Sequence, residues 1–307
     1  MNAIIQTKEL SRRFGRTEAV RNLSLDVPRG SIFALLGPNG AGKTTTIKML
    51  LNMIRPTGGR ATVLGTESTR LGPSEFTRIG YVSENQELPD WMTVQDLIDF
   101  CRPMYPSWDQ DLCRQLTRQF DLPLSRKIKG FSRGMRIKAA LLVSLAYRPE
   151  LVVLDEPFSG LDALVRDEFM RGLLELSDRT EWTVLVSSHD IDEVERLVDW
   201  VGVIDKGSLR VSECTASLEA RFRSCQLTLE SGGRLPDMLP DSWLLPETVG
   251  RTVRFVESVY KEGTGDDFIR TVMPEAREVT VSRMSLKAIF MALARTYRSQ
   301  GREKEWA

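Results

Sequence analysis

The chain has 307 residues, of which 41% are apolar and 27% charged, enough for one large globular domain and a smaller one. Its 42 basic and 42 acidic side chains balance, so no overall charge drives it toward nucleic acid or anionic lipid. The four cysteines lack CxxC spacing, which argues against a disulfide framework or a zinc site. We expect no secretory leader, and the longest apolar run, 139–147, is about half the length of a membrane-spanning helix. These features favour a cytoplasmic protein.

Short strands and one helix are expected in the N-terminal third. Alternating or apolar patterns predict strands at 4–7, 24–27 and 79–83. A compact apolar strand at 31–36 runs into a glycine-rich loop, and helical spacing follows over 43–53. Strand, glycine-rich loop and helix therefore follow one another directly.

The pattern changes to helices between Trp91 and Ala146. Proline breaks separate three stretches of helical apolar spacing, at 93–102, 108–120 and 134–147. The strand that comes next is fully apolar, which is typical of a buried position in a parallel sheet. The elements expected from there on are strand 151–154, helix 161–176, strand 184–187, helix 190–198, and a hairpin of strands 201–205 and 209–212.

The last part of the chain has a different pattern of short alternating strands and two helices. The expected elements are strands at 224–229, 252–256 and 278–282 and helices at 268–273 and 286–297. We therefore expect two domains, residues 1–215 with a helical insert at about 85–148, and a small α+β domain at 216–307.

The loop Gly37–Thr44 reads GPNGAGKT and fits the phosphate-loop pattern completely, between a strand and a helix. Its glycines let successive backbone N–H groups curl around the β- and γ-phosphates of ATP, helped by the helix N-terminus. Lys43 neutralises phosphate charge, and the Thr44 hydroxyl is placed to ligate Mg²⁺. The predicted ATP-binding residues here are Gly37, Pro38, Asn39, Gly40, Ala41, Gly42, Lys43, Thr44 and Thr45.

Two carboxylates follow the apolar strand LVVL. The strand delivers Asp155 to the Mg²⁺ site, and the adjacent Glu156 is free to polarise the attacking water. An isolated Asp-Glu pair after a strand is weak evidence, since it is often a solvated strand end. With a phosphate loop upstream, the pair predicts an ATP-hydrolysing site.

A third motif, FSRGM at Phe131–Met135, precedes a helix and lies between the phosphate loop and the carboxylates. This order, ending in LVVLDEP, resembles the ATP-binding cassette (ABC) family. Ser159–Asp162 (SGLD) resembles the family's D-loop, and His189, the only histidine in the chain, stands at its switch position. The resemblance covers roughly residues 3–215. It implies an α/β P-loop NTPase fold, a RecA-like core with an antiparallel β subdomain and a helical insert.

The resemblance also implies that two cassettes close head to tail around two ATP molecules. Ser132 and Gly134 of one chain would then contact the γ-phosphate held by the other chain, and Asp162 would lie across the interface. His189 would act with Glu156 at the γ-phosphate and the attacking water. Since the chain holds one cassette, function would require a homodimer or a second ATPase chain.

Beyond these motifs, Phe14 matches a family position, and the chain departs from the family pattern in the FSRGM loop and at Glu84. Phe14 matches the aromatic that such proteins stack on adenine, although a core position fits it about equally well. Arg133 and Met135 replace the commonest Gly and Gln of the family loop, as in exporter-type ATPases whose membrane part is a separate chain. Glu84 stands where the family has a Mg²⁺-contacting Gln; a carboxylate still coordinates Mg²⁺, so we expect a metal ligand here, with Gln86 as the substitute if the loop slips.

These features predict the ATP-hydrolysing subunit of a membrane exporter, peripheral on the cytoplasmic face of the membrane. A separate multi-spanning permease would dock on the helical insert, the cofactors would be ATP and Mg²⁺, and no nucleic acid is expected. One alternative is a soluble cassette ATPase acting on ribosomes, although such proteins usually carry two cassettes in one chain. A coiled-coil DNA-repair ATPase would need hundreds of heptad residues, and a kinase would leave the S-x-G loop and His189 without a purpose.

Overall fold

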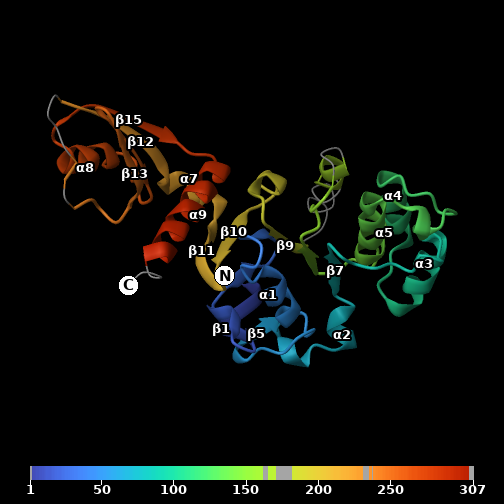
Figure 1. Cartoon of the computed structure of the whole chain (residues 1–307). Coiled ribbons are helices and arrows are strands. Elements are labelled where there is room, and N and C mark those ends of the chain that lie inside the picture. The colour runs from blue at the N-terminus through green and yellow to red at the C-terminus, as the bar shows by residue number, and fades with distance from the viewer. Residues whose placement is uncertain (1, 162–164, 171–181, 231–234, 237, 304–307) are drawn as a thin grey trace. The chain divides into compact units, whose positions relative to one another are not determined.

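The chain divides into two compact units, Met1–Ser212 and Glu213–Ala307 (Figure 1). The predicted helix 161–176 lies largely outside the described residues, although 165–170 is helical. Within the part of the chain that is described, no helix is long and apolar enough to span a membrane. The computed structural model describes residues 2–161, 165–170, 182–230, 235–236 and 238–303.

A six-stranded sheet in the first unit carries the predicted phosphate loop. Its strands are β4 (Ile32–Leu36), β7 (Ile79–Ser83), β8 (Leu151–Asp155), β9 (Thr183–Ser188), β10 (Trp200–Asp205) and β11 (Ser208–Cys214). The order is β11-β10-β4-β9-β8-β7, and the neighbours from β10 to β7 pair in parallel. Strands β4, β8 and β9 are buried along their whole length, which explains their mainly apolar sequences. Since the carboxyl ends of parallel strands meet at one edge, the loops after β4, β7, β8 and β9 converge there.

Five further strands form an antiparallel sheet. They are β1 (Ala3–Phe14), β2 (Thr17–Leu23), β3 (Asp26–Pro28), β5 (Gly58–Val63) and β6 (Thr66–Glu67). The order is β2-β1-β5-β6, with β3 paired to β1. The sequence predicted only residues 4–7 of β1, because most of the strand beyond them is exposed or half-buried and polar. Glu9, with φ 50°, stands near the register shifts at which β1 turns between its partners.

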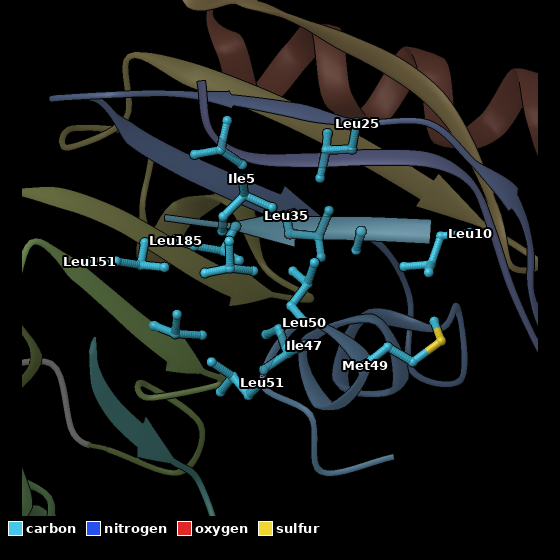
Figure 2. Close-up of a cluster of buried hydrophobic side chains, with 14 of the residues drawn as sticks. Ile5, Leu10, Leu25, Leu35, Ile47, Met49, Leu50, Leu51, Leu151 and Leu185 are labelled. Atoms are coloured by element: carbon cyan, nitrogen blue, oxygen red, sulfur yellow. The ribbon is translucent and has the colours of Figure 1, made fainter. Parts of the chain in front are cut away.

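Helix α1 (Lys43–Leu50) packs into one hydrophobic core with both sheets (Figure 2). Its Ile47 and Leu50 are buried in the same cluster as Ile5 of β1, Leu35 of β4 and Leu185 of β9. Each such side chain contributes roughly 1.5–3 kcal/mol on burial. This core therefore fixes the start of α1 relative to the end of β4, where the glycine-rich loop lies.

A helical segment, residues 94–145, lies between β7 and β8 in the chain. Tyr147, just after its last helix, donates its buried hydroxyl to the carbonyl of Ile79 on β7 at 2.7 Å. Ser144 Oγ donates to the carbonyl of Tyr81 on the same strand at 3.2 Å. The last helix of the segment is therefore fastened along β7. The helices of this segment are α3 (Val94–Cys101), α4 (Gln110–Gln119) and α5 (Arg133–Leu145), with 3-10 turns at Arg102–Met104 and Ile128–Gly130. Helix α2 (Pro73–Phe76) and a 3-10 turn at Ser68–Arg70 come before β7.

The predicted helix at 190–198 was wrong. Only a 3-10 turn, Ile191–Glu193, forms, and turns follow it. The Ser188 hydroxyl accepts from the backbone N–H of Asp190 at 3.0 Å. The Asp190 carboxylate in turn accepts from the N–H of Asp192 at 3.0 Å. The Ser188 hydroxyl also donates to the buried Glu193 carboxylate, and this contact holds the chain in the short turn.

The second unit is built on a four-stranded antiparallel sheet. Its elements are β12 (Arg223–Leu229), β13 (Trp243–Val249), β14 (Thr252–Glu257), β15 (Ala276–Arg283), α7 (Thr215–Arg221), α8 (Gly265–Val272) and α9 (Leu286–Glu303). The strand order is β13-β14-β12-β15. Its own core includes Trp243 and Phe255, whose rings stack with centroids 3.8 Å apart. Strand β13 was not predicted, because WLLPETV contains a proline and is largely exposed.

Candidate active site

The glycine-rich loop joins the end of β4 to the start of α1. Gly42, with φ 108°, occupies a left-handed conformation, and a Cβ there would lie 2.5 Å from the carbonyl oxygen of Ala19. A Cβ at Gly37 would lie 2.2 Å from the carbonyl oxygen of Ile204. No side chain caps α1 and its first turn holds no acidic residue, so its N-terminal N–H groups suit an anion.

Lys43 is the first residue of α1, and its ammonium is buried inside the loop. Its Nζ donates to the carbonyls of Gly37 at 2.6 Å and Pro38 at 3.2 Å. It also lies 3.0 Å from Oε1 of Glu156, which is itself buried. The phosphate-binding cation and the predicted water-polarising carboxylate are therefore in direct contact.

Three oxygen-bearing side chains meet beside the loop. The Thr44 hydroxyl donates to Oδ1 of Asp155 at 3.0 Å, and the Ser187 hydroxyl donates to the same oxygen at 2.7 Å. Burial raises the pKa of Asp155 above its ordinary value, against the opposing effect of these two hydrogen bonds. A donor set made only of oxygens suits Mg²⁺. Thr44 and Asp155, which the sequence assigned to the metal, are thus brought together.

Glu156 links this group to the histidine. It has φ 52°, a left-handed conformation that is unusual for a residue with a side chain. Its Oε2 lies 2.8 Å from Nδ1 of His189, and its N–H donates to Ser187 Oγ at 3.0 Å. Glu193 also lies beside the histidine: a carboxylate oxygen of Glu193, one of Glu156 and a ring nitrogen of His189 lie within 4.8 Å of one another. The Glu193 carboxylate accepts from the Ser188 hydroxyl.

Sequence reasoning missed Ser187 and Glu193. Ser187 ends β9 at the sheet edge where β8 delivers Asp155, and the parallel register pairs these two residues. The convergence of strand ends was the signal that could have identified it. Glu193 gave no such signal, because its approach to His189 depends on the irregular turn that replaces the expected helix.

The loop Phe131–Met135, named here the signature loop, leads into α5. Ser132 is the N-cap of this helix, and its Oγ accepts from the N–H of Met135 at 3.3 Å. A Cβ at Gly134 would lie 2.9 Å from a methyl group of Val165, so α5 approaches the chain after β8 closely. Asp162, the third predicted residue of the composite site, lies outside the described residues.

Glu84, the third predicted metal ligand, is bound by Arg133 and Ser159. The Oε1 atom of Glu84 accepts from Arg133 at 2.8 Å and from Ser159 Oγ at 2.8 Å, and no contact with Thr44 or Asp155 side chains is found among the described residues. The side-chain oxygen of Gln86, the alternative ligand, accepts from the backbone N–H of Ser83 at 3.3 Å.

Phe14 is 47% exposed at the end of β1, so the core position considered for it is wrong. Its stacking on adenine remains a prediction.

We expect the free energy of unfolding to depend on pH through His189. The Glu156 hydrogen bond raises the pKa of His189 above its ordinary 6.5, with Glu193 acting in the same sense and burial and Lys43 in the opposite one. Protonated His189 therefore stabilises the fold fully below pH 6.5, and this contribution is lost as pH rises through the raised pKa. Urea denaturation should show a larger stability difference between wild type and H189Q at pH of about 6 than at about 9. A difference that does not vary with pH would contradict this linkage.

Comparisons with known proteins identify the family of the chain. The family model "ABC transporter" matches residues 20–159. An ABC transporter ATP-binding protein of Synechocystis is 32% identical over 75% of this chain and 68% of its own length. The bacitracin transport ATP-binding protein BcrA of Bacillus licheniformis is 33% identical over 68% of this chain and 69% of its own. The probable multidrug ABC transporter ATP-binding protein YbhF of Escherichia coli is 32% identical over 71% of this chain and 38% of its own.

Solved structures show the same fold. One is the ATP-binding subunit of an ABC transporter, with a TM-score of 0.64 and 25% identity, covering 70% of this chain and 92% of that one. Another is a dimeric ATP-binding cassette bound to ADP and Pi, with a TM-score of 0.61 and 20% identity, covering 68% of this chain and 98% of that one. By sequence and by fold, then, the chain belongs to the ABC transporter family, as one of its ATP-binding and ATP-hydrolysing subunits with the P-loop NTPase fold.

Proposed function

We propose that this chain powers an ABC exporter, in which nucleotide-driven closure of two cassettes moves a substrate through a separate multi-spanning permease. The contact between Lys43 and Glu156 carries the ATPase part of the proposal, because it joins the phosphate-binding cation to the carboxylate that polarises water. Two similar proteins bear names for bacitracin transport and multidrug transport, and the FSRGM loop resembles that of exporter-type ATPases. The chain then acts at the cytoplasmic face of the membrane.

Lys43, Glu156 and His189 are the side chains that act in the proposed hydrolysis. Lys43 and Glu156 lie 3.0 Å apart in a buried setting and neutralise each other. An entering γ-phosphate offers the Lys43 ammonium a more highly charged partner, so Glu156 is released to accept a proton from the attacking water. His189, held by the other Glu156 oxygen at 2.8 Å, is placed to donate toward the γ-phosphate.

Thr44 and Asp155 are the proposed ligands of Mg²⁺, since their oxygens already meet at 3.0 Å. When bound there, Mg²⁺ neutralises phosphate charge. The third predicted ligand, Glu84, has its carboxylate bound by Arg133 and Ser159 in this structure.

A second cassette, a copy of this chain or a related ATPase, completes the proposed composite site. Ser132 stands at the exposed N-terminus of α5, where its hydroxyl and the first helical N–H groups suit the γ-phosphate of the opposing cassette. Gly134 keeps α5 close to the loop that leads to Asp162. Phe14 is exposed and so is available to stack on adenine.

Purification of the tagged chain from membranes tests the exporter assignment. We expect a multi-spanning protein to copurify with it, and reconstitution of the two in liposomes should give ATP-dependent substrate movement out of the compartment that represents the cytoplasm. Movement in the opposite direction would reject the exporter assignment while keeping the ABC transporter subunit. Copurification with ribosomes, together with ribosome-stimulated ATPase activity, would favour the soluble alternative.

A further inference from the structure

The Oε1 atom of Glu84 accepts hydrogen bonds from two side chains in different parts of the chain. Arg133 Nη2, at the first residue of α5, lies 2.8 Å away, and Ser159 Oγ, in the loop after β8, lies 2.8 Å away. The ion pair with Arg133 is the main cause that holds the pKa of Glu84 below its ordinary value. The backbone N–H of Glu84 also donates to the carbonyl of Asp155 at 2.9 Å. Glu84 is therefore bound to the signature loop and to both ends of the turn after β8.

The other side of the Arg133 guanidinium packs on the same turn. Gly160 has φ 68°, and a Cβ there would lie 2.8 Å from Arg133 Nη1. Since Gly160 has no side chain, it leaves room for the guanidinium, which lies between Glu84 and Gly160. One arginine thus touches the loop after β7 and the loop after β8.

The ion pair of Arg133 with Glu84 also links α5 to the loop that follows β7. Tyr147 and Ser144 bond to strand carbonyls near the C-terminal end of the helix, and Arg133 bonds to Glu84 at its N-terminal end. The first two bonds are buried or part-buried and uncharged. The third is an ion pair whose Arg and Glu side chains are 43% and 32% exposed. The N-terminal end of α5, which bears Ser132, is therefore held in part by this pair, beside the close packing of Gly134 on Val165 and the ion pair of Arg136 with Asp90 at 2.7 Å.

We propose that Glu84 and Arg133 are positioning residues, which together set the place of Ser132 in the composite ATP site, and that Glu84 acts through Arg133 and not as a magnesium ligand. Two of the three residues at which this chain departs from the common family pattern, Glu84 and Arg133, are explained by one contact, because the arginine neutralises the charge that glutamate adds near the phosphates. The inference rests on the proposed role of Ser132 at the ATP of a second cassette.

A double-mutant cycle on ATPase activity tests the pair. We expect E84Q and R133Q each to lower kcat by about fivefold, and the double variant E84Q/R133Q to be no slower than either, since contacting residues are not additive. The charge swap E84R/R133E should recover kcat to within about twofold of wild type, because the Ser159 hydroxyl can accept as well as donate. The KM for ATP should stay within about twofold throughout, because the phosphate loop is untouched.

Controls separate this role from metal binding and from general stability. R148Q removes a similar ion pair, to Asp109 at 2.7 Å in the helical segment, and should leave kcat unchanged. The Mg²⁺ concentration for half-maximal activity should not change in E84Q. A rise of tenfold or more in E84Q, with kcat and Mg²⁺ dependence unaffected in R133Q, would show that Glu84 is a magnesium ligand and overturn the inference.

A second readout keeps the inference testable apart from turnover. In an E156Q background, ATP-driven dimerisation measured by light scattering should need more ATP when E84Q or R133Q is added, and the swap should restore it. Additive effects of the two substitutions on dimerisation would reject the pairing even where ATP is bound and hydrolysed normally. A wild-type chain that neither dimerises with ATP nor hydrolyses it would instead reject the proposed function.

Discussion

Replacing Glu156 by Gln should lower kcat for ATP hydrolysis by at least about 100-fold while ATP binding is kept. The amide cannot accept the proton of the attacking water, and it no longer neutralises the Lys43 ammonium that it faces at 3.0 Å. Lys43 is then free for the phosphates without first leaving a carboxylate. We therefore expect fluorescent-nucleotide titration to show equal or tighter ATP binding, and gel filtration with ATP to show a persistent dimer.

The neighbouring carboxylate offers a matched control. Glu193 is also buried beside His189, yet it bonds to Ser188 and has no contact with Lys43 among the described residues. E193Q should keep most of the hydrolysis that E156Q loses. Full turnover by E156Q would remove Glu156 from the role of general base, and equal losses in both variants would assign the effect to burial of charge near the histidine.

Replacing Gly42 by Ala should destabilise the first unit by about 2–5 kcal/mol and abolish measurable ATP binding. The residue has φ 108°, and the new methyl group would lie 2.5 Å from the carbonyl oxygen of Ala19. Relief of that clash would move β2 or the start of α1, and with it the Lys43 ammonium. Urea denaturation and nucleotide titration measure the two effects.

Gly40 provides the comparison, because it shares the left-handed conformation without the crowding. Its φ is 80°, and a Cβ there meets nothing within 4 Å. G40A should therefore cost only the conformational part, about 1–2 kcal/mol. If G40A and G42A were equally destabilising, the approach of β2 to the loop would have no part in the effect.

The sequence was most informative where one physical requirement fixes both residue type and place. The strand at 31–36 and the GPNGAGKT loop predicted β4, α1 and the place of Lys43 between them, since a phosphate loop needs glycine and lysine at set spacing. The apolar strand 151–154 likewise predicted β8 and the delivery of Asp155 beside Thr44. Such arguments are local and do not require knowledge of the remaining chain.

Interactions between distant residues could not be predicted in this way. The turn at 191–193 replaces a helix because the Ser188 hydroxyl binds the buried Glu193 carboxylate, a contact that apolar periodicity does not register. The ion pair of Arg133 with Glu84 joins residues 49 apart in the chain, and neither has a pattern that names the other. Motif spacing and the family resemblance therefore named the candidate site residues, whereas the tertiary structure decided their partners.

The left-handed backbone of Glu156 lowers the stability of the fold at this residue. A residue with a side chain at φ 52° costs roughly 1–2 kcal/mol relative to glycine. A Glu156→Gly substitution would relieve this strain, but it would also leave the buried Lys43 ammonium without its carboxylate, a loss of about 3–5 kcal/mol. The strained backbone at this residue is therefore tolerated because it keeps one carboxylate between Lys43 and His189.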